Sequence, residues 1–528
     1  DEAGTAITTG DYNVAVGYNT LSSNTTGTRN SAVGTRSGLQ NTTGNYNAFF
    51  GYDAGESNTT GSSNTFVGDS SGRETTTAAS NTAVGQASLL VNTTGTANVA
   101  LGTASLQANT TASNNTGVGY LSLATNTTGA SNVALGAYAL DANTTASNNT
   151  AVGYNSLGAN TTGTLNTAVG KDALLANTTG DQNTALGTYT LDASTTGASN
   201  TGLGYGALSA NTTASNNTAV GSFALVANTT GTNNTAIGYA SLESITTGGD
   251  NTALGYRAGD SLTTGNNNAI VGRSALSSDT LGDRAVAIGS GALATQNFTS
   301  STDNYNVGVG FNAGVAVTTG VANTLIGGLA GDALTTGGSN VLIGYSTGTY
   351  GANLTTGSGN VLIGPYTDST TAGGNQAHGL GYNLDCAPSY TTLGNNASDI
   401  RAAHGVATWA TVSDQRYKKD IVDSTAGLSF INALQPRTFK YKTLGELPET
   451  FNAYEADSTE VFKNSDTNHG FIAQEIKAAI DADSSIADGF KLWDDREDGS
   501  QEVAEAALIP ILVKAIQELT ARITTLEG

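Results

Sequence analysis

Small apolar residues alternate with polar residues in short segments that recur at a constant interval along most of this chain. Each segment opens with Asn, as in "NTAVG", and this opening residue falls every 17 residues from Asn13 to Asn268. The next step reaches Ala285 and a four-residue insertion follows; the register then resumes at Asn306 and ends with a longer step to Asn360. A register held over this length identifies an internal repeat.

One repeat unit contains the signals expected of a single coil. In "NTAVGYNSLGANTTGTL", residues 149–165, the alternating segment closed by Gly predicts a short strand followed by a tight corner. A second, more apolar pair follows, such as Ser156-Leu157 in this unit or Ala173-Leu174 in the next. The "NTTG" segment supplies turn residues, and we expect its Gly to adopt a positive φ angle.

Seventeen residues are too few for an independent unit but suffice for one coil of a parallel β-solenoid. Stacked coils would bury the Val, Leu and Ala faces of their neighbours and align the Asn side chains in ladders. We therefore predict a mostly β fold with a solenoid rod over residues 1–374. At about 4.8 Å per coil and about 20 coils, its length is on the order of 100 Å. The density of Gly, Asn and Thr argues against an α-solenoid.

Residues 375–412 lose the period, and we expect a transition segment of short strands with Trp409 as a local anchor. The repeats resemble those of phage tail fibres and bacterial surface fibres, and they are similar to the left-handed β-roll heads of trimeric autotransporter adhesins. The units that begin at Asn47 ("NAFFGYDAG") and Asn64 ("NTFVGDSSG") depart from the pattern. Two explanations stay open for them, a contact patch or capping variation near the end of the rod.

The final segment, residues 505–528, has a helical pattern. Its apolar residues alternate spacings of three and four, which predicts a coiled-coil seam: Ile509, Leu512, Ile516, Leu519, Ile523 and Leu526. Pro510 fits near the first turn of this helix. Ile and Leu in these positions nominally favour a dimer.

Charge divides the chain near residue 412. The net charge is −22, yet only 8 of the 20 Lys and Arg residues lie in residues 1–412, and the other 12 lie in residues 413–528. Nucleic acid is not an expected partner, because its backbone requires basic patches. Membrane insertion is not expected either, because no run approaches the ~18 apolar residues of a spanning helix. The chain opens at Asp1 without a signal-like segment, so we expect a removed upstream segment or numbering that starts inside a longer product.

Residues suited to bind metals are sparse. Cys386 is the single cysteine, which excludes an intrachain disulfide framework and leaves the redox compartment open. The three His residues lack the spacing of a zinc site: His378, His404 and His469. Four residues of "DDREDGSQEVAE" match positions 1, 5, 6 and 12 of a calcium loop: Asp494, Asp498, Gly499 and Glu505. Arg496 stands where an oxygen ligand is needed, so we favour an acidic turn leading into a helix and expect no metal or cofactor.

Three stretches beyond the charge boundary belong together: "TVSDQRYKKDI" (411–421), "LQPRTFKYK" (434–442) and "HGFIAQEI" (469–476). In this order they resemble the intramolecular chaperone auto-processing domain at the C-terminus of phage tailspikes, tail fibres and endosialidases. The resemblance covers about residues 409–528 and implies a chaperone domain at residues 413–528 that acts in a trimer. It further implies Ser413 as a nucleophile, Lys418 as its base and cleavage of the Val412–Ser413 bond.

The implied chemistry sets requirements on these residues. A serine hydroxyl is a weak nucleophile until a base removes its proton. Lysine is a base only when neutral, so Lys418 would need burial or neighbouring cations such as Arg416 and Lys419 to lower its pKa; Asp414 is a further possible supporting group. A separation of five residues suits neither a strand face nor a helix face, so a turn would have to bring the pair together. The alternative is a solvated basic surface loop.

These observations predict an extracellular homotrimeric fibre for attachment, on a virion tail or a cell surface, with a cell-surface glycan or protein as receptor. The resemblance implies a trimer, and the slender rod needs partners to cover its sides, so we expect a trimer rather than the dimer. A secreted or surface-anchored bacterial fibre that keeps its C-terminal domain uncleaved is the first alternative. A polysaccharide-degrading tailspike is the second, and it requires clustered carboxylates on one rod face, for which the candidates are Asp141, Asp172, Asp192 and Glu243.

Overall fold

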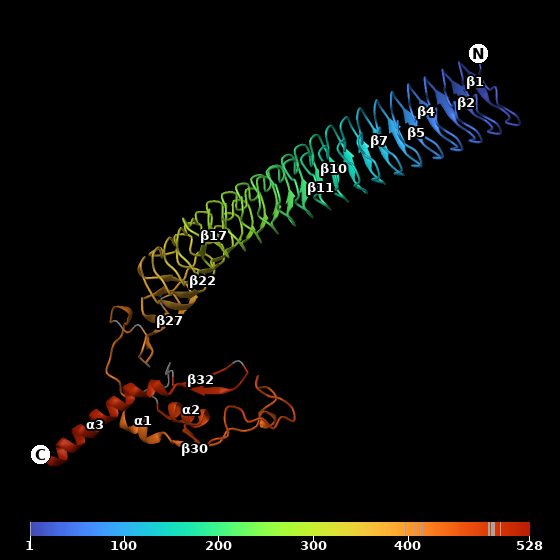
Figure 1. Cartoon of the computed structure of the whole chain (residues 1–528). Helices are drawn as coiled ribbons and strands as arrows, with labels where there is room; N and C mark the ends of the chain where they lie inside the picture. Colours follow the sequence, from blue (N-terminus) through green and yellow to red (C-terminus); the bar gives the residue numbers. More distant parts are fainter. Residues whose placement is uncertain are drawn as a thin grey trace. The chain divides into compact units, whose positions relative to one another are not determined.

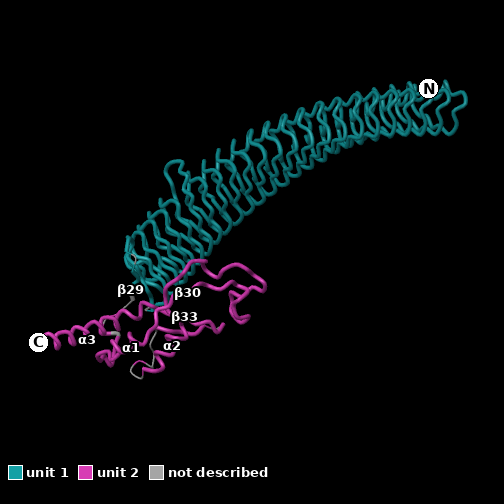
Figure 2. Tube along the Cα trace, turned by 90° about the horizontal axis from the view of Figure 1, so that it is seen from below, with its two compact units in different colours: residues 1–412 teal, residues 413–528 magenta. Residues whose placement is uncertain are grey.

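Each sequence repeat forms one coil, and each coil contributes a short strand to a parallel sheet that follows the stack (Figure 1). The computed structural model describes residues 2–396, 398–406, 408–411, 413, 415–483, 486, 492–496 and 498–528. The chain divides into two compact units, residues 1–412 and residues 413–528 (Figure 2). The predicted mostly β fold, with a solenoid of about 22 coils, is confirmed.

The strands of the main sheet are three residues long in nearly every coil. They are β1 (Val14–Val16), β2 (Ser31–Val33), β3 (Ala48–Phe50), β4 (Thr65–Val67), β5 (Thr82–Val84), β6 (Val99–Leu101), β7 (Thr116–Val118), β8 (Val133–Leu135), β9 (Thr150–Val152), β10 (Thr167–Val169), β11 (Thr184–Leu186), β12 (Thr201–Leu203), β13 (Thr218–Val220), β14 (Thr235–Ile237), β15 (Thr252–Leu254), β16 (Ala269–Val271), β18 (Val286–Ile288), β20 (Val307–Val309), β21 (Thr324–Ile326), β22 (Val341–Ile343) and β23 (Val361–Ile363). Each strand pairs in parallel with the strands that precede and follow it in this list. The residues that pair are usually one repeat apart in the sequence, as Ala168 and Ala185 are.

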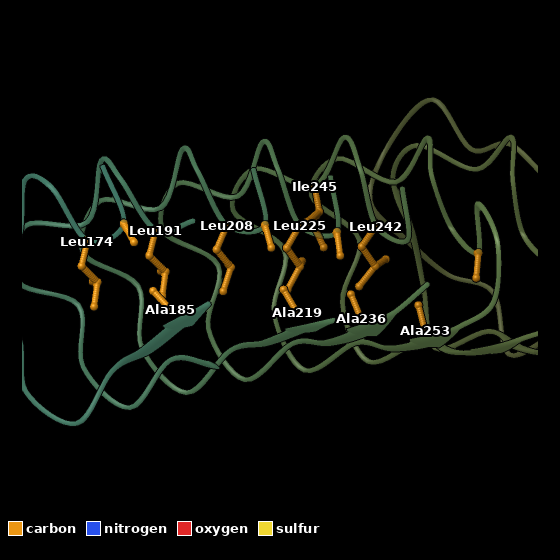
Figure 3. Packing of buried hydrophobic residues seen from close by; sticks show 14 of the residues in the cluster. Leu174, Ala185, Leu191, Leu208, Ala219, Leu225, Ala236, Leu242, Ile245 and Ala253 are labelled. Carbon is orange, nitrogen blue, oxygen red and sulfur yellow. The ribbon is translucent and has the colours of Figure 1, made fainter. Parts of the chain in front are cut away.

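The core of the rod is formed by two facing rows of side chains. The middle residue of each strand, usually Ala, points inward, and the Leu of the following corner faces it from across the coil, as Ala185 and Leu191 do (Figure 3). The prediction that Val would also be buried is wrong. The third strand residue points outward, so Val16 is 56% exposed and Leu135 is 47% exposed. Side chains alternate across a strand, and the inward set is the one that contains the opening Asn and the Ala.

The glycine prediction also needs correction. The Gly that follows each strand has the positive φ angle, as at Gly153 (134°), whereas the Gly of "NTTG" is not among the residues with positive φ. That second Gly is needed for close approach, because a Cβ on Gly163 would lie 2.4 Å from the Gly180 carbonyl oxygen of the next coil. Left-handed conformations also occur at non-glycine positions such as Asn155 and Leu157.

Two columns of buried Asn connect the coils, and they confirm the expected ladders. In the column that opens the strands, the Asn166 N–H donates to Asn149 Oδ1 at 2.9 Å, and Asn149 Nδ2 donates to the Gly163 carbonyl at 2.9 Å. In the column of the "NTTG" turns, Asn177 Nδ2 donates to Asn160 Oδ1 at 2.8 Å. These bonds satisfy polar groups that would otherwise be buried without partners.

The departures at Asn47 and Asn64 are explained by packing inside the coils. Phe49 and Phe66 are fully buried and stack at 5.5 Å between ring centroids. The corner Leu is replaced by Gly nearby, and a Cβ on Gly55 would lie 2.7 Å from the Phe49 ring. The Phe side chains in these strands are therefore accommodated by corners without a side chain. For the two Phe side chains, neither a contact patch nor end capping is the explanation.

The coil that contains the insertion keeps the sheet in register. Val286 of β18 pairs with Val307 of β20, a shift of 21 residues, and β17 (Gly282–Asp283) pairs with β19 (Thr302–Asp303) beside it. Ala285 stands where an Asn side-chain oxygen would accept the backbone N–H of Asn306 in the next coil. Asn304 supplies the missing acceptor, because its Oδ1 receives the Asn306 N–H at 2.9 Å.

Coils continue beyond residue 374, where the sequence repeat fades. β25 (His378–Tyr382) pairs in parallel with β23 and with β27 (Tyr390–Asn395), while β24 (Asp368–Ser369) pairs with β26 (Asp385–Cys386). The antiparallel strands β28 (Ser398–Ala403) and β29 (Ala410–Thr411) follow. The sequence repeat fades here because Ala377 replaces the opening Asn, although the Ala377 N–H still donates to Asn360 Oδ1. Trp409 is 51% exposed, so it does not form the expected local anchor.

The second unit is a small α/β region. Its elements are α1 (Leu428–Ala433), β30 (Arg437–Phe439), the 3-10 turn η2 (Leu444–Glu446), β31 (Asn468–Gly470), α2 (Ala473–Ala482), β32 (Trp493–Asp495), β33 (Gln501–Val503), the 3-10 turn η3 (Glu505–Leu508) and α3 (Ile509–Glu527). One buried cluster holds them together: Ala426, Phe430, Ile476, Ile480, Leu492, Leu508 and Ile511. Within the described ranges, no helix has the length and apolar character needed to cross a membrane.

Candidate self-processing site

Ser413 and Lys418 lie in contact at the first residues of the second unit. Lys418 Nζ donates to Ser413 Oγ at 2.6 Å. The 3-10 turn η1 (Gln415–Tyr417) separates the two residues, and the Lys418 N–H closes it on the Gln415 carbonyl at 3.0 Å. This turn reverses the chain, so a pair five residues apart can meet although neither helix nor strand spacing would allow it.

The surroundings of the pair are open to solvent. Ser413 and Lys418 are both exposed, as are the predicted supporting residues Arg416 and Lys419. Val412 and Asp414 lie outside the described residues. Lys418 Nζ lies within the hydrogen-bond reach of Ser413 Oγ that a general base requires. Neither side chain is buried in one chain.

The other two stretches named in the sequence analysis contact each other in the same unit. β30 pairs antiparallel with β31, with Thr438 opposite His469. Arg437 of β30 binds Glu475 of α2 through one edge of its guanidinium group, with Nε donating to Oε2 at 2.9 Å and Nη2 to Oε1 at 2.6 Å. The bond from Arg437 lowers the pKa of the Glu475 carboxyl. A fork-to-fork pair of this kind fixes the orientation of both side chains.

A third contact in this unit was not predicted from the sequence. The Glu518 carboxylate of α3 accepts the Leu428 N–H at the start of α1, at 2.9 Å. Because α1 lacks a capping side chain of its own, Glu518 serves as its cap from 90 residues away. No local sequence signal marks such a distant cap, although an acid on an apolar helix could have drawn attention to it.

The predicted helix at the C-terminus is present as α3, with Pro510 in its first turn. Ile511 and Ala515 face the core of the unit and are buried. The six predicted seam residues face away from that core and are exposed, between 42% at Leu512 and 86% at Leu526. An apolar stripe at coiled-coil spacing, left uncovered by its own chain, is suited to bind helices of other chains.

The remaining candidate residues have structural partners. Arg496 pairs with Glu502 across the β32–β33 hairpin, and Asp498 accepts from Ser500, so the calcium-like sequence forms a turn. The His378 and His404 rings lie 4.6 Å apart, and His469 contacts Thr438. Cys386 is buried, and burial raises the pKa of its thiol to about 12. Over the described part of the chain, no three His, Cys, Asp or Glu side chains form a metal-binding group.

The four carboxylates considered for polysaccharide cleavage do not all lie together, although Asp172 is near enough to Asp192 to add to the rise that burial causes in the pKa of Asp192. Asp141, Asp192 and Glu243 occupy equivalent places three coils apart, which corresponds to about 14 Å along the rod. Asp172 is bound by its neighbour Lys171. Glycosidases place their two carboxyl groups roughly 5 to 9.5 Å apart, so the three equivalent carboxylates are too widely spaced.

Comparison with known proteins bears on the second unit. No curated protein and no solved structure gave a match to the chain. Residues 413–483 match a family model described as "Chaperone of endosialidase". The match begins at Ser413, the first residue of the second unit, and includes α1, β30, β31 and α2. The chain therefore joins a β-solenoid rod to a C-terminal region that is similar to the chaperone of endosialidase.

Proposed function

We propose that this chain is an extracellular fibre that assembles as a homotrimer and serves in attachment, and that its second unit directs assembly and then cleaves the Val412–Ser413 bond. The observation that carries the proposal is the 2.6 Å contact between Lys418 Nζ and Ser413 Oγ at the boundary between the units. The family match that begins at Ser413 supports it, as does the exposed seam of α3.

A fibre of this design needs a device that sets its register. Successive coils are nearly identical, so pairing shifted by one repeat costs little. A coiled coil of three α3 helices, joined through their seams, would align equivalent residues of the three chains before the rods associate. Removal of the second unit would then separate the folded product from the template that formed it. Such a product is held by a kinetic barrier to unfolding.

The cleavage follows from the position of the nucleophile beside the bond it attacks. Neutral Lys418 takes the proton of Ser413 Oγ, and the oxygen attacks the Val412 carbonyl carbon. The Val412–Ser413 C–N bond breaks, the nitrogen takes a proton, and an ester joins the Val412 acyl group to Ser413 Oγ. Water hydrolyses this ester and leaves a carboxylate at Val412 and a free amine at Ser413. The net reaction consumes one water molecule, and the serine hydroxyl is regenerated.

Coupling to assembly follows from solvation of the lysine. Lys418 is exposed in a single chain, and a lysine serves as a base only in its neutral form. Contact with neighbouring chains would remove water from Lys418, and the nearby Arg416 and Lys419 would disfavour its charge further. Cleavage would then proceed in the trimer and be slow in the monomer.

The test is intact mass and a denaturing gel of four chains: wild type, Ser413→Ala, Lys418→Met and the matched control Lys419→Met. We expect wild type and Lys419→Met to yield fragments of 412 and 116 residues (528 − 412). Ser413→Ala and Lys418→Met should remain whole. A wild type that forms trimers and stays whole would instead support the retained, uncleaved fibre of bacterial surface type. Release of reducing sugar from a polysaccharide by the full chain would be required for the tailspike alternative.

A further inference from the structure

The outward face of the rod sheet carries a continuous uncharged surface. The third residue of each strand, which we call the outer column, is Val, Leu, Ile or Phe in every coil from Val16 to Leu380. None of these residues is buried. The first residue of each strand lies on the same face and is Val, Ser, Ala or Thr from Val14 to Val361. No charged side chain interrupts either position over this length, in a chain with net charge −22.

The apolar area of this face exceeds what a soluble monomer usually exposes. Full burial of a Val or Leu side chain contributes about 2.5 kcal/mol, and each Å² of buried apolar area contributes about 25 cal/mol. Such a side chain therefore has roughly 100 Å² of apolar area. Twelve residues of the outer column are 36–56% exposed and the other ten are half-buried, so the column presents roughly 800 Å². The largest apolar patch of a typical monomer is about 300–600 Å². A stable interface buries about 800 Å² per partner.

We infer that the outer column is the surface along which copies of this chain pack, parallel and in register, with equivalent coils facing each other. The inference rests on the proposed homotrimer and names the surface that this trimer uses along the rod. A partner that covers a stripe of this length must be equally long and must repeat at the same interval, and a second copy satisfies both conditions. Acidic rods repel each other, so the uncharged face is where they can approach.

The register follows from the geometry of the column. Each coil offers one apolar side chain, and the next lies about 4.8 Å along the axis. Large members such as Leu135, Leu203 and Leu254 are interspersed with Val. A parallel arrangement fixed at the C-terminus would place each residue of the column beside its own equivalents in the other chains.

Cysteine cross-linking in the full chain tests this arrangement. In a Cys386→Ser background, Leu203→Cys and, separately, Leu254→Cys are oxidised with diamide, and Thr196→Cys in an exposed turn is the matched control. We expect disulfide-linked dimers from the two column variants at least tenfold more abundant than from the control. Mixed assembly of the Leu203→Cys and Leu254→Cys chains should give no heterodimer. The two positions lie about 14 Å apart along the rod, whereas a disulfide needs Cα atoms within about 7 Å.

Two outcomes would overturn the inference, and light scattering distinguishes them. If the chain is trimeric and neither column variant cross-links, the rods do not meet at this face, although the proposed assembly stands. Accessible column residues in such a trimer would mark a free surface for an apolar or glycan ligand. If the chain is monomeric, both the inference and the proposed function fail. Two column positions are used so that misfolding of one variant does not decide the result.

Discussion

Asn177 and Ser194 occupy the same buried position in successive coils, and neither Asn177 Oδ1 nor Ser194 Oγ has a hydrogen-bond partner. Asn177 Nδ2 continues the ladder toward Asn160, so the ladder is broken on one side only. The same defect occurs where Thr75 follows Asn58, because Asn58 Oδ1 and Thr75 Oγ1 are also unpartnered. Interruptions of the Asn column therefore leave buried polar atoms unsatisfied, each at a cost of about 1–3 kcal/mol.

Ser194→Asn should stabilise the rod for this reason. The new amide would donate to Asn177 Oδ1, and its own oxygen would face Asn211 Nδ2 of the following coil. We expect a gain of about 1–2 kcal/mol in the free energy of unfolding, measured by denaturant unfolding monitored by circular dichroism. Thr75→Asn is a second site for the same repair, and the exposed Thr196→Asn is a control that should change nothing. Loss of stability at both repair sites would show that the ladder does not govern local stability.

Asn304 should be as important as any Asn of the regular column. It lies outside the repeat, yet it supplies the acceptor that Ala285 cannot provide to Asn306. Its Nδ2 also donates to the Asp283 carbonyl. We expect Asn304→Ala to cost about 1–3 kcal/mol, the same as Asn166→Ala in a regular coil. Equal unfolding midpoints for wild type and Asn304→Ala would contradict this role, provided that Asn166→Ala is destabilised.

The repeat determines most of what could be predicted here. The period placed every strand of the main sheet from β1 to β23, and the Leu of Ser156-Leu157 correctly marked the core. Burial of Val was predicted wrongly, because hydrophobicity favours Val over Ala when the width of the coil is unknown. A narrow coil admits Ala opposite Leu, and it admits Phe49 only where Gly replaces Leu. The contact between Ser413 and Lys418 depends on one short turn, which no periodic signal reports.

Acidity should stabilise the rod over a limited range. Burial raises the pKa of the buried Asp279 and Asp368 and of the half-buried Asp192. A carboxyl whose pKa is raised in the folded protein binds a proton more readily in the folded state than in the unfolded state. The destabilisation caused by its buried charge is therefore relieved as the pH falls through the folded-state pKa. We expect a higher thermal midpoint at pH 5 than at pH 8, with a smaller difference in Asp279→Asn.

His378 acts in the opposite direction, and this provides the control for the pH experiment. Burial and the neighbouring His404 lower the pKa of His378, so its contribution to stability is lost as pH falls below about 6.5. His378→Gln should therefore enlarge the gain between pH 8 and pH 5. A wild-type midpoint that falls steadily over this range, with no change in either variant, would contradict both assignments.

The seam of α3 should control assembly without affecting the fold of one chain. Ile516 and Ile523 are 61% and 51% exposed, so Asp in both places costs little in the monomer but introduces charge at a buried position of a coiled coil. We expect Ile516→Asp/Ile523→Asp to be monomeric in light scattering and to lose self-cleavage. Gln517→Asp/Thr524→Asp adds the same charge beside the seam and should remain assembled and processed. Assembly of the seam variant would place the trimer contacts elsewhere.

Ser413→Cys should reveal the intermediate of the cleavage reaction. A thiol attacking the Val412 carbonyl gives a thioester instead of an ester, and the thiolate is the more nucleophilic group at neutral pH. We expect the variant to cleave, and we expect hydroxylamine or dithiothreitol to accelerate release of the 412-residue fragment, because both attack thioesters readily. With hydroxylamine, the fragment should carry a hydroxamate at Val412, visible as a mass increase over the acid. Ser413→Ala under the same reagents is the control and should stay whole. If Ser413→Cys cleaves and the fragment carries only a carboxylate at Val412 even with hydroxylamine present, the bond is hydrolysed directly by water, and residue 413 is not the nucleophile.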